Sequence, residues 1–246
     1  MPENQITHLL NLIYQNDRLK PAPALALLAD AFPGQTVFSS SFSYEDQVIT
    51  HLICTNQLPI DIFTLDTGRL FPETYSVWSS TNEKYGQPVK AYFPAGPALE
   101  AMVAEKGPNS FYASVENRKS CCYIRKVEPL KRALAGKACW ITGLRAAHSA
   151  DRHDLPQLEW DAANQIIKYH PLLHWSLDEI KNFISENQVP YNPLHDKGFV
   201  SIGCAPCTRA IRPGEDFRAG RWWWEDADKK ECGLHVHEPH IAEKTI

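Results

Sequence analysis

The sequence lacks the features that mark several large classes of protein. None of its apolar runs approaches the roughly 18 residues that a membrane helix needs. The start, MPENQITHLL, has no basic region, no long apolar stretch and no small-residue cleavage site, so we expect a cytoplasmic protein. There are no internal repeats, and the net charge of −4 argues against a general nucleic-acid binder. A small anionic ligand held by a local basic cluster stays compatible with that charge.

What is present is typical of an ordinary globular protein. Of its 246 residues, 43% are hydrophobic and 22% are charged. This length suffices for one large α/β domain with appendages, or at most for two small domains. The seven cysteines are too sparse, and odd in number, for a secreted disulfide framework. In a reducing compartment, grouped cysteines more often bind metal or carry out redox chemistry.

Hydrophobic patterning predicts strands that alternate with helices over most of the chain. Helical spacing of apolar residues predicts helices at 22–32, 44–55, 71–86 and 176–188. Short β-forming or continuously apolar runs predict strands at 36–40, 61–65, 89–93, 137–143 and 165–170. Ser176 and Glu179 are spaced as a capping box for the last helix. This βαβα order predicts an α/β fold with a doubly wound, mostly parallel sheet.

The composition changes after Val189, where Pro, Gly, Cys, Arg and Trp dominate and periodicity is weak. We expect a single domain over residues 1–246, with a core at about 20–190 and a C-terminal segment at about 191–246. The segment is too rich in cysteine, tryptophan and arginine for a disordered linker, so we expect it to fold around something.

Two polar stretches follow neighbouring predicted strands. The first, SSSFSYED at 39–46, runs from a strand into a helix, where free N–H groups and the helix dipole suit a phosphate. A serine-rich helix cap explains it equally well, and it has neither the glycines nor the lysine of a Walker loop. The second, LDTGR at 65–69, lies where open α/β sheets bind ligands. Taken alone it is a turn closed by Asp and Gly, but two such junctions together favour a binding site.

The cysteines carry the strongest signal. Cys121 and Cys122 are adjacent, and Cys204 and Cys207 form a CxxC pair about eighty residues later. Four thiolates suit a [4Fe–4S] cluster or a structural zinc ion. Adjacent cysteines strain a zinc tetrahedron, which favours iron–sulfur and leaves zinc as the alternative. Cys232, in ECGLH, is flanked by glycine and lies close to His235, as in a reactive thiol; the alternative is an incidental surface cysteine.

Basic residues gather in sequence around these motifs and suggest an anionic ligand. Lys126 follows Cys122 by four positions, which places both on one side of a helix, and Pro129 predicts a kink or a boundary there. Any of these cations has a surface salt bridge as its alternative, most of all Arg125 and Arg212. The group consists of Arg125, Lys126, Arg145, Arg152, Arg209, Arg212, Arg218 and Arg221.

Taken together, these motifs closely resemble the assimilatory adenylyl-sulfate reductases, the cluster-containing branch of the sulfonucleotide reductase family. The resemblance rests on SFSYEDQV, LDTGRLFPETY, CCYIRK, ITGLR with a downstream arginine, GCAPCTR, GEDFRAGRWWWE and ECGLH. It covers the chain from about residue 35 to residue 237. It implies a nucleotide-binding fold related to the pyrophosphatase-loop enzymes (adenine-nucleotide alpha-hydrolase-like).

The resemblance also implies a reaction, in which adenylyl sulfate is reduced to sulfite and AMP through a sulfonated Cys232. Lys126 and His235 would be catalytic with it, and Cys121, Cys122, Cys204 and Cys207 would hold a [4Fe–4S] cluster. A homo-oligomer is expected, with no nucleic-acid or membrane partner. The implied substrate-binding residues are Ser41, Phe42, Ser43, Asp46, Leu65, Asp66, Thr67, Gly68, Gly143, Arg145, Arg152, Arg218 and Arg221.

An external reductant is expected. Only Cys54 and Cys139 remain to resolve the intermediate, and both fall in predicted regular elements, where we expect them to be buried. Plant-type relatives carry a fused thioredoxin-like domain that this chain is too short to contain, so free thioredoxin or glutaredoxin would supply the electrons.

Three other functions compete with this one. A 3′-phosphoadenylyl-sulfate reductase generally keeps ECGLH but lacks the four cluster cysteines, although some cluster-containing members could accept both substrates. A pyrophosphatase-loop transferase that uses ATP would need a glycine-rich SGGxDS-like loop, which SFSYED is not. A zinc-stabilised nucleotide-binding or nucleic-acid-binding module would leave Cys232 without a role.

Overall fold

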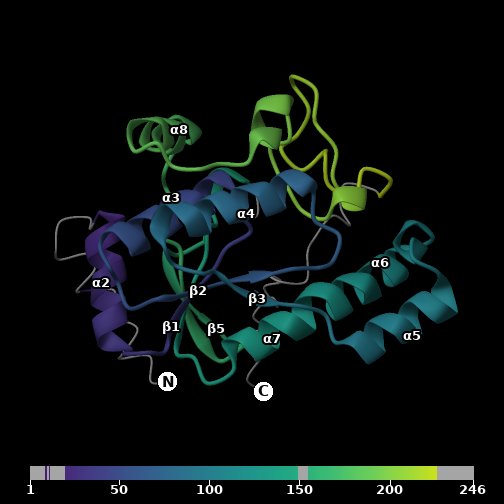
Figure 1. Ribbon diagram of the computed structural model, residues 1–246, viewed down its shortest axis with the longest axis horizontal. Coiled ribbons are helices and arrows are strands. Elements are labelled where there is room, and N and C mark those ends of the chain that lie inside the picture. The colour runs from purple at the N-terminus through teal and green to yellow at the C-terminus, as the bar shows by residue number, and fades with distance from the viewer. Residues whose placement is uncertain (1–8, 10, 12–19, 149–154, 226–246) are drawn as a thin grey trace, which may run out of the picture.

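The computed structural model describes residues 9, 11, 20–148 and 155–225 (Figure 1). Its centre is a six-stranded sheet in the order β3-β2-β1-β4-β6-β5. All neighbouring strands pair in parallel except β5, which runs antiparallel to β6 at one edge. The strands are β1 Thr36–Ser39, β2 Asp61–Leu65, β3 Lys90–Tyr92, β4 Cys139–Ile141, β5 Leu158–Asp161 and β6 Ile166–Tyr169. The predicted α/β fold with a mostly parallel sheet is confirmed.

Successive residues of the central strands point to opposite faces of the sheet, and both faces are apolar. Helices therefore cover both faces. On one face Phe38 and Ile141 pack with α2, α3 and α8, and on the other Val37 and Trp140 pack with α7. Figure 1 shows α3 and α4 crossing above the strands and α7 below them. The helices are α2 Pro21–Ala31, α3 Tyr44–Thr55, α4 Pro72–Tyr85, α5 Gly96–Lys106, α6 Val115–Cys122, α7 Glu128–Leu134 and α8 Leu177–Glu186.

The strand order reverses beside β1, which has β2 on one side and β4 on the other. The chain leaves β1 toward β2 and β3, and later returns to β4 and β6. Loops that follow β1 and β4 therefore diverge from each other at the carboxyl edge, which is where doubly wound sheets bind ligands. Ser40, Asp66 and Thr142 are the first residues after β1, β2 and β4.

Most predicted elements are confirmed. The helix at 44–55 and the strand at 61–65 have the predicted bounds, and the capping box of Ser176 and Glu179 is formed. Among the elements that were missed, α5 and β5 have little apolar patterning. Only Met102 is buried in α5, and only Leu158 is fully buried in β5. Of the isolated cysteines, Cys139 is buried in β4, as predicted, whereas Cys54 near the end of α3 is only partly buried.

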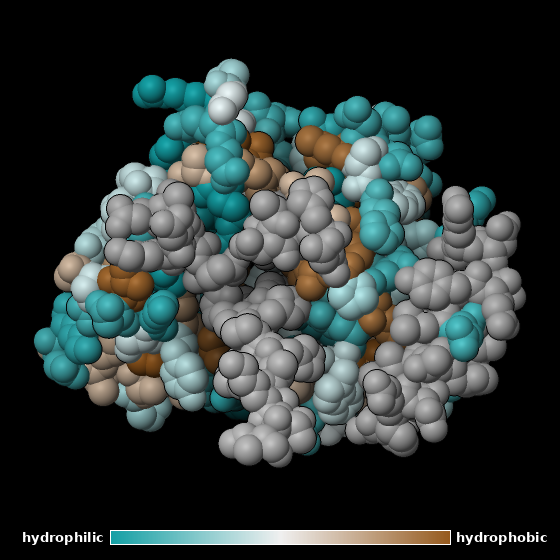
Figure 2. Space-filling view, turned by 180° about the vertical axis from the view of Figure 1, so that it is seen from behind, coloured by the Kyte–Doolittle hydropathy of each residue, from teal (hydrophilic) through white to brown (hydrophobic). Residues whose placement is uncertain are grey.

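The segment from 191 to 225 folds without long helices or strands. It contains two short 3-10 turns, Pro193–Lys197 and Ala205–Cys207, and a bridge between Thr208 and Arg221. Among the residues that the structure describes, no helix is both long and apolar enough to cross a bilayer. In Figure 2, apolar residues on the visible face form separate patches among hydrophilic ones.

Candidate functional site

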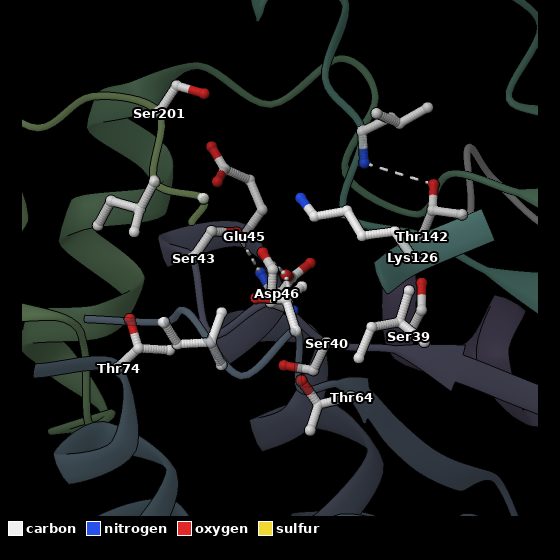
Figure 3. Close-up of a pocket in the computed structure, with 18 of the residues that line it drawn as sticks. Ser39, Ser40, Ser43, Glu45, Asp46, Thr64, Thr74, Lys126, Thr142 and Ser201 are labelled. Atoms are coloured by element: carbon white, nitrogen blue, oxygen red, sulfur yellow. Dashed lines mark hydrogen bonds between the residues drawn. The ribbon is translucent and has the colours of Figure 1, made fainter. Parts of the chain in front are cut away.

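A cavity of about 230 Å³ opens at the carboxyl edge of the sheet (Figure 3). The two polar stretches predicted as neighbours both contribute to its wall, together with the loop after β4 and two parts of the C-terminal segment, at 200–203 and 217–218. Residues of the predicted site that line it are Ser41, Ser43, Asp46, Leu65, Thr67, Lys126, Gly143 and Arg218. The structure thus gathers side chains that are up to 177 positions apart, from 41 to 218, around one space.

Asp46 organises the loop between β1 and α3. Its Oδ2 accepts hydrogen bonds of 2.6 Å from both the backbone N–H and the hydroxyl of Ser41. Ser43 caps α3 through a hydrogen bond from the Asp46 N–H to its hydroxyl oxygen, at 3.4 Å. Burial raises the pKa of Asp46 to about 6, and the Ser41 hydrogen bonds only partly oppose this. Serine hydroxyls and the N-terminus of α3 therefore both border the cavity.

Phe42 supports this loop from behind. It is buried, has a φ of +60° and stacks on Trp78 with ring centroids 5.6 Å apart. A left-handed conformation is uncommon for a bulky residue, so the packing of the ring holds the turn in a shape that the backbone alone disfavours. Phe42 therefore shapes the loop and is not among the residues that line the cavity.

The loop after β4 closes against the same carboxylate. A Cβ atom on Gly143 would lie 2.1 Å from Asp46 Oδ1, so only glycine fits there. Arg145, two residues on, pairs with Glu45 at 2.7 Å, and both side chains are buried. Its Nη1 also donates to the carbonyl of Trp175 at 3.1 Å. Arg145 is thus engaged in the wall behind the cavity and does not line it.

The loop after β2 joins the cavity to the cysteines. Asp66 closes its turn by accepting hydrogen bonds from the Gly68 N–H at 2.8 Å and from the Tyr75 hydroxyl at 2.9 Å. Gly68 has a φ of +69°, which favours glycine. Thr67 lines the cavity, and its hydroxyl lies 3.2 Å from the sulfur of Cys204. Asp66 and Gly68 therefore close a turn, as the structural alternative for this motif predicted, while Leu65 and Thr67 line the cavity.

All four paired cysteines line one small hollow next to the cavity. Cys121, Cys204 and Cys207 are buried and share an apolar cluster with Phe111 and Trp222. Lys126 lines both this hollow and the cavity. Figure 3 shows its amine pointing into the cavity. The prediction that the two cysteine pairs meet agrees with this arrangement, and Lys126 is the side chain common to both spaces.

Three buried hydrogen-bond donors in and around the hollow lack an acceptor. Within the described residues, the Nε atoms of Arg125 and Arg221 and Nε1 of Trp222 are buried and have no hydrogen-bond partner. Arg125 lines the hollow, Trp222 packs with its cysteines, and Arg221 lies over the Trp222 ring at 4.8 Å. Buried donors of this kind are rare without an acceptor, so an anionic group among the cysteines fits the site.

In the described part of the chain, no three His, Cys, Asp or Glu side chains lie close enough together to hold a single metal ion. A tetrahedral zinc needs all its sulfur ligands about 2.3 Å from one centre, whereas a cubane takes each thiolate on a different iron. Burial raises the pKa of Cys207 to about 12 and also raises that of Cys121, so binding of metal must displace their protons. Four cysteine sulfurs around one hollow are the donor set that a [4Fe–4S] cluster takes, so the residues present fit that group.

A π-helical turn that contains Lys126 follows the cysteine pair directly. Helix α6 ends at Cys122, the π turn spans Tyr123–Val127, and α7 begins at Glu128 with Pro129 in its first turn. The boundary predicted at Pro129 is thus confirmed. Cys122 and Lys126 both line the hollow, in agreement with their predicted placement on one side of a helix, although the turn that carries Lys126 is π-helical and not α-helical.

Several cations differ from their predicted places. Arg125 is buried and donates to the Thr67 carbonyl, so it is not a surface partner. Arg221 packs so closely on Gly203 that a Cβ there would lie 2.3 Å from its guanidinium. Arg209 forms a partly exposed ion pair with Glu215 at 2.8 Å, and Arg212 is exposed, as its surface alternative predicted. Arg118, which also lines the hollow, was missed; its position one turn before Cys121 was the available signal.

Three predicted residues fall outside the described ranges. These are Cys232 and His235 in the C-terminal segment and Arg152 after β4. Their proposed roles stay predictions from the sequence.

Comparisons with known proteins agree with this geometry. The phosphoadenosine phosphosulfate reductase domain family matches residues 35–210. An adenosine 5′-phosphosulfate reductase of Allochromatium vinosum is 54% identical over 202 residues, which are 82% of this chain and 79% of that protein. A crystal structure of the phosphoadenylyl-sulfate reductase of Candida auris, a phosphate complex, superposes with a TM-score of 0.72 at 28% identity and covers 86% of this chain and 98% of that one.

The fold extends to another group of nucleotide enzymes. The FMN adenylyltransferase of Candida glabrata, in complex with FAD and inorganic pyrophosphate, superposes with a TM-score of 0.53 at 17% identity. The match covers 96% of this chain and 76% of that one. At this identity the likeness concerns the fold alone. It agrees with the expected relation to adenine-nucleotide-binding folds.

Proposed function

Because the chain belongs to the phosphoadenosine phosphosulfate reductase domain family, we propose that it reduces adenylyl sulfate to sulfite and AMP. Within that family it groups with the adenosine 5′-phosphosulfate reductases. One observation carries the proposal. A nucleotide-sized cavity and a four-cysteine hollow share the side chain of Lys126. A sulfonucleotide reductase with a cluster needs these two sites to be adjacent.

The cavity would bind the nucleotide with its anionic end toward the cysteines. Serine hydroxyls and the N-terminus of α3 border the cavity, and Lys126 and Arg218 line it as cations. The cavity lining also includes Leu65, Leu144 and Trp140, whose apolar side chains suit an uncharged, flat group such as adenine. Anion binding by Arg218 is supported by its place in the lining, whereas Arg145 would act through Glu45.

Cys121, Cys122, Cys204 and Cys207 would hold a [4Fe–4S] cluster. When bound, the cluster would join the two cysteine pairs and set the electrostatic field at Lys126, beside the sulfate of the substrate. The cations Arg118 and Arg125 also line the hollow and would balance the negative charge of four thiolates.

Chemistry would begin at Cys232. Its thiolate attacks the sulfur of adenylyl sulfate, a sulfur–sulfur bond forms, and the bond from that sulfur to the phosphate oxygen breaks. The electron pair of the broken bond leaves with AMP, and Cys232 becomes an S-sulfocysteine. Lys126 and Arg218 would stabilise the negative charge that grows on the departing phosphate. His235, three residues on, would favour the thiolate when protonated.

Thioredoxin or glutaredoxin would complete the cycle. One of its thiolates attacks Cys232 at sulfur, sulfite leaves with the electron pair, and the second thiol of the reductant resolves the mixed disulfide. The described cysteines support an external reductant. Burial raises the pKa of Cys54 to about 11 and that of Cys139 to about 12, so neither is an available thiolate at neutral pH. We also propose that residues 1–246 act as one domain of a cytoplasmic homo-oligomer.

The direct test begins with anaerobically purified protein. Iron, sulfide and zinc are quantified, and sulfite release is then followed with thioredoxin and either adenylyl sulfate or its 3′-phosphorylated form. The proposal predicts about four irons per chain and sulfite from adenylyl sulfate. A colourless, zinc-loaded protein that makes no sulfite would contradict it and favour a zinc-stabilised binding module. Equal turnover of the 3′-phosphorylated substrate would indicate dual specificity.

A further inference from the structure

A buried ion pair joins α6 to the last described turn of the chain. Arg118 donates from Nε to Glu225 Oε1 at 3.0 Å and from Nη2 to Oε2 at 2.8 Å. The side chains of Arg118 and Glu225 are only 1% and 3% exposed. Paired hydrogen bonds of this kind fix the orientation of both groups as well as their distance.

The pair connects the two halves of the cysteine site. Arg118 lies one helical turn before Cys121, and its guanidinium stacks over the Trp222 ring at 4.7 Å. The backbone N–H of Trp222 donates to the carbonyl of Cys207 at 3.2 Å. The N–H of Glu225 donates to the carbonyl of Trp222 at 2.9 Å and closes the turn. Arg118 and Glu225 therefore bind the helix of one cysteine pair to the segment that packs on the other.

Glu225 also determines where the remaining chain departs. Cys232 follows it by seven residues, which span at most about 25 Å when fully extended. The segment that leads to Glu225 already borders the cavity, through Phe217 and Arg218. Because only seven residues join Glu225 to Cys232, the position of Glu225 limits which places the Cys232 thiol can reach.

We propose that Arg118 and Glu225 are positioning residues. Their ion pair fixes Glu225, from which the chain continues to Cys232, against helix α6, which carries Cys121 and Cys122. The inference rests on the proposed function for the role of Cys232. Stability alone is a weak reason for such a pair, because well-packed apolar residues often replace a buried ion pair without loss. Its bidentate geometry is what a positioning role requires.

The test compares two substitutions of the same kind. Glu225→Gln keeps the side-chain shape but removes the buried charge. Glu215→Gln is the matched control, because Glu215 pairs with Arg209 in the same segment at 2.8 Å but with side chains that are 32% and 36% exposed. Three quantities are measured: AMP affinity by calorimetry, iron per chain during exposure to air, and the rate at which Cys232 gains a sulfonate from adenylyl sulfate without reductant.

Glu225→Gln should slow sulfonation of Cys232 by about tenfold or more, because freed residues must be ordered again at each encounter. It should also speed the loss of iron in air and leave AMP affinity unchanged. Glu215→Gln should stay within about twofold of the unmodified protein, as exposed ion pairs contribute little. Sulfonation of Glu225→Gln at the unmodified rate, with normal iron retention, would overturn the proposal.

A double variant covers the case in which Glu225→Gln fails to fold around an unpaired arginine. Arg118→Gln combined with Glu225→Gln removes both charges of this pair and should fold, yet it should remain slow in sulfonation. A double variant that reacts at the unmodified rate would also overturn the proposal. If the unmodified protein forms no adduct, the proposed function fails. The role of the ion pair is then tested by iron retention alone, and a normal rate of iron loss in Glu225→Gln and in the double variant would refute that role.

Discussion

The cavity and the cysteine hollow meet at Lys126, but they are built in different ways. Much of the cavity wall consists of residues at the carboxyl ends of parallel strands and in the loops after them, held by short-range contacts such as Ser41 with Asp46 and Asp66 with Gly68. The hollow is assembled from segments without periodicity by contacts between distant residues, such as Arg118 with Glu225 and Thr67 with Cys204. The first follows from the topology of the sheet, whereas the second depends on side-chain chemistry.

This contrast predicts that the two sites are separable. A doubly wound sheet supports its carboxyl edge with a core on each face, so nucleotide binding should survive damage to the hollow. The hollow has a small core of its own, in which three of the cysteines take part. It should therefore depend on the group that the cysteines hold.

The largest effect is expected for Cys207→Ser, which removes one of the four sulfurs. The variant should lose most of its iron and its sulfite production, because the remaining three cysteines leave the cluster without a full ligand set. AMP affinity should stay within about threefold, since Cys207 does not line the cavity. Iron analysis and calorimetry on the same sample check this. A variant that keeps its full iron content would contradict the assignment of Cys207 as a ligand.

Lys126→Gln tests the side chain that both sites share. Loss of a cation beside the departing phosphate should lower kcat/KM by about a hundredfold, while the iron content stays normal. Lys131→Gln is the matched control, because that lysine lies over the Tyr123 ring of the same helical region and lines neither space. Steady-state sulfite release gives the comparison. Equal activity of the two variants would show that Lys126 has no role in the reaction.

Gly143→Ala should affect the cavity alone. The added methyl group would meet Asp46 Oδ1 at 2.1 Å, so the β4 loop or the start of α3 must shift. Strain of about 1–3 kcal/mol is expected, together with a loss of AMP affinity of about tenfold and unchanged iron. Gly96→Ala is the control, because its nearest neighbour is a flexible Glu100 oxygen at 3.9 Å. Normal AMP binding by Gly143→Ala would contradict the placement of this loop in the nucleotide site.

The last prediction concerns the pH dependence of stability and leaves the reaction itself aside. Burial raises the pKa of Asp46 from 3.8 to about 6, so the folded protein binds a proton more tightly than the unfolded chain does. Its contribution to stability is present below about pH 4 and is lost as the pH rises through 6, by at most about 1.4 kcal/mol per pH unit. Asp46→Asn should lack this loss. Urea unfolding of both proteins between pH 4 and 7 measures the difference, and parallel curves would contradict the raised pKa.

Local rules made most of the fold predictable. Ser43 before an apolar stripe and continuous apolar runs such as DIFTL determine their elements within a few neighbours, and both elements have the predicted bounds. The same reasoning failed for α5, where a helix with a single buried residue has no apolar face to detect. The π turn at Tyr123–Val127 likewise has no signature that separates it from an α-helix.

The candidate site was predictable only in part. Spacing and chemistry singled out the four cysteines and Lys126, which the structure brings together. The pairing of Arg118 with Glu225 joins residues 107 positions apart, and nothing local in either segment indicates it. Arg145 pairs with the buried carboxylate of Glu45, which its place near a motif did not indicate, and its predicted contact with a ligand stays a prediction.

The most direct test of the account is the mass of the peptide that contains Cys232 after incubation with adenylyl sulfate and no reductant. The account predicts the mass gain of one sulfonate on Cys232, with one AMP released for each adduct and sulfite freed when thioredoxin is added. Cys232→Ser should bind AMP and keep its iron but form no adduct. Sulfite production by Cys232→Ser, or an adduct on a different cysteine, would contradict the central claim.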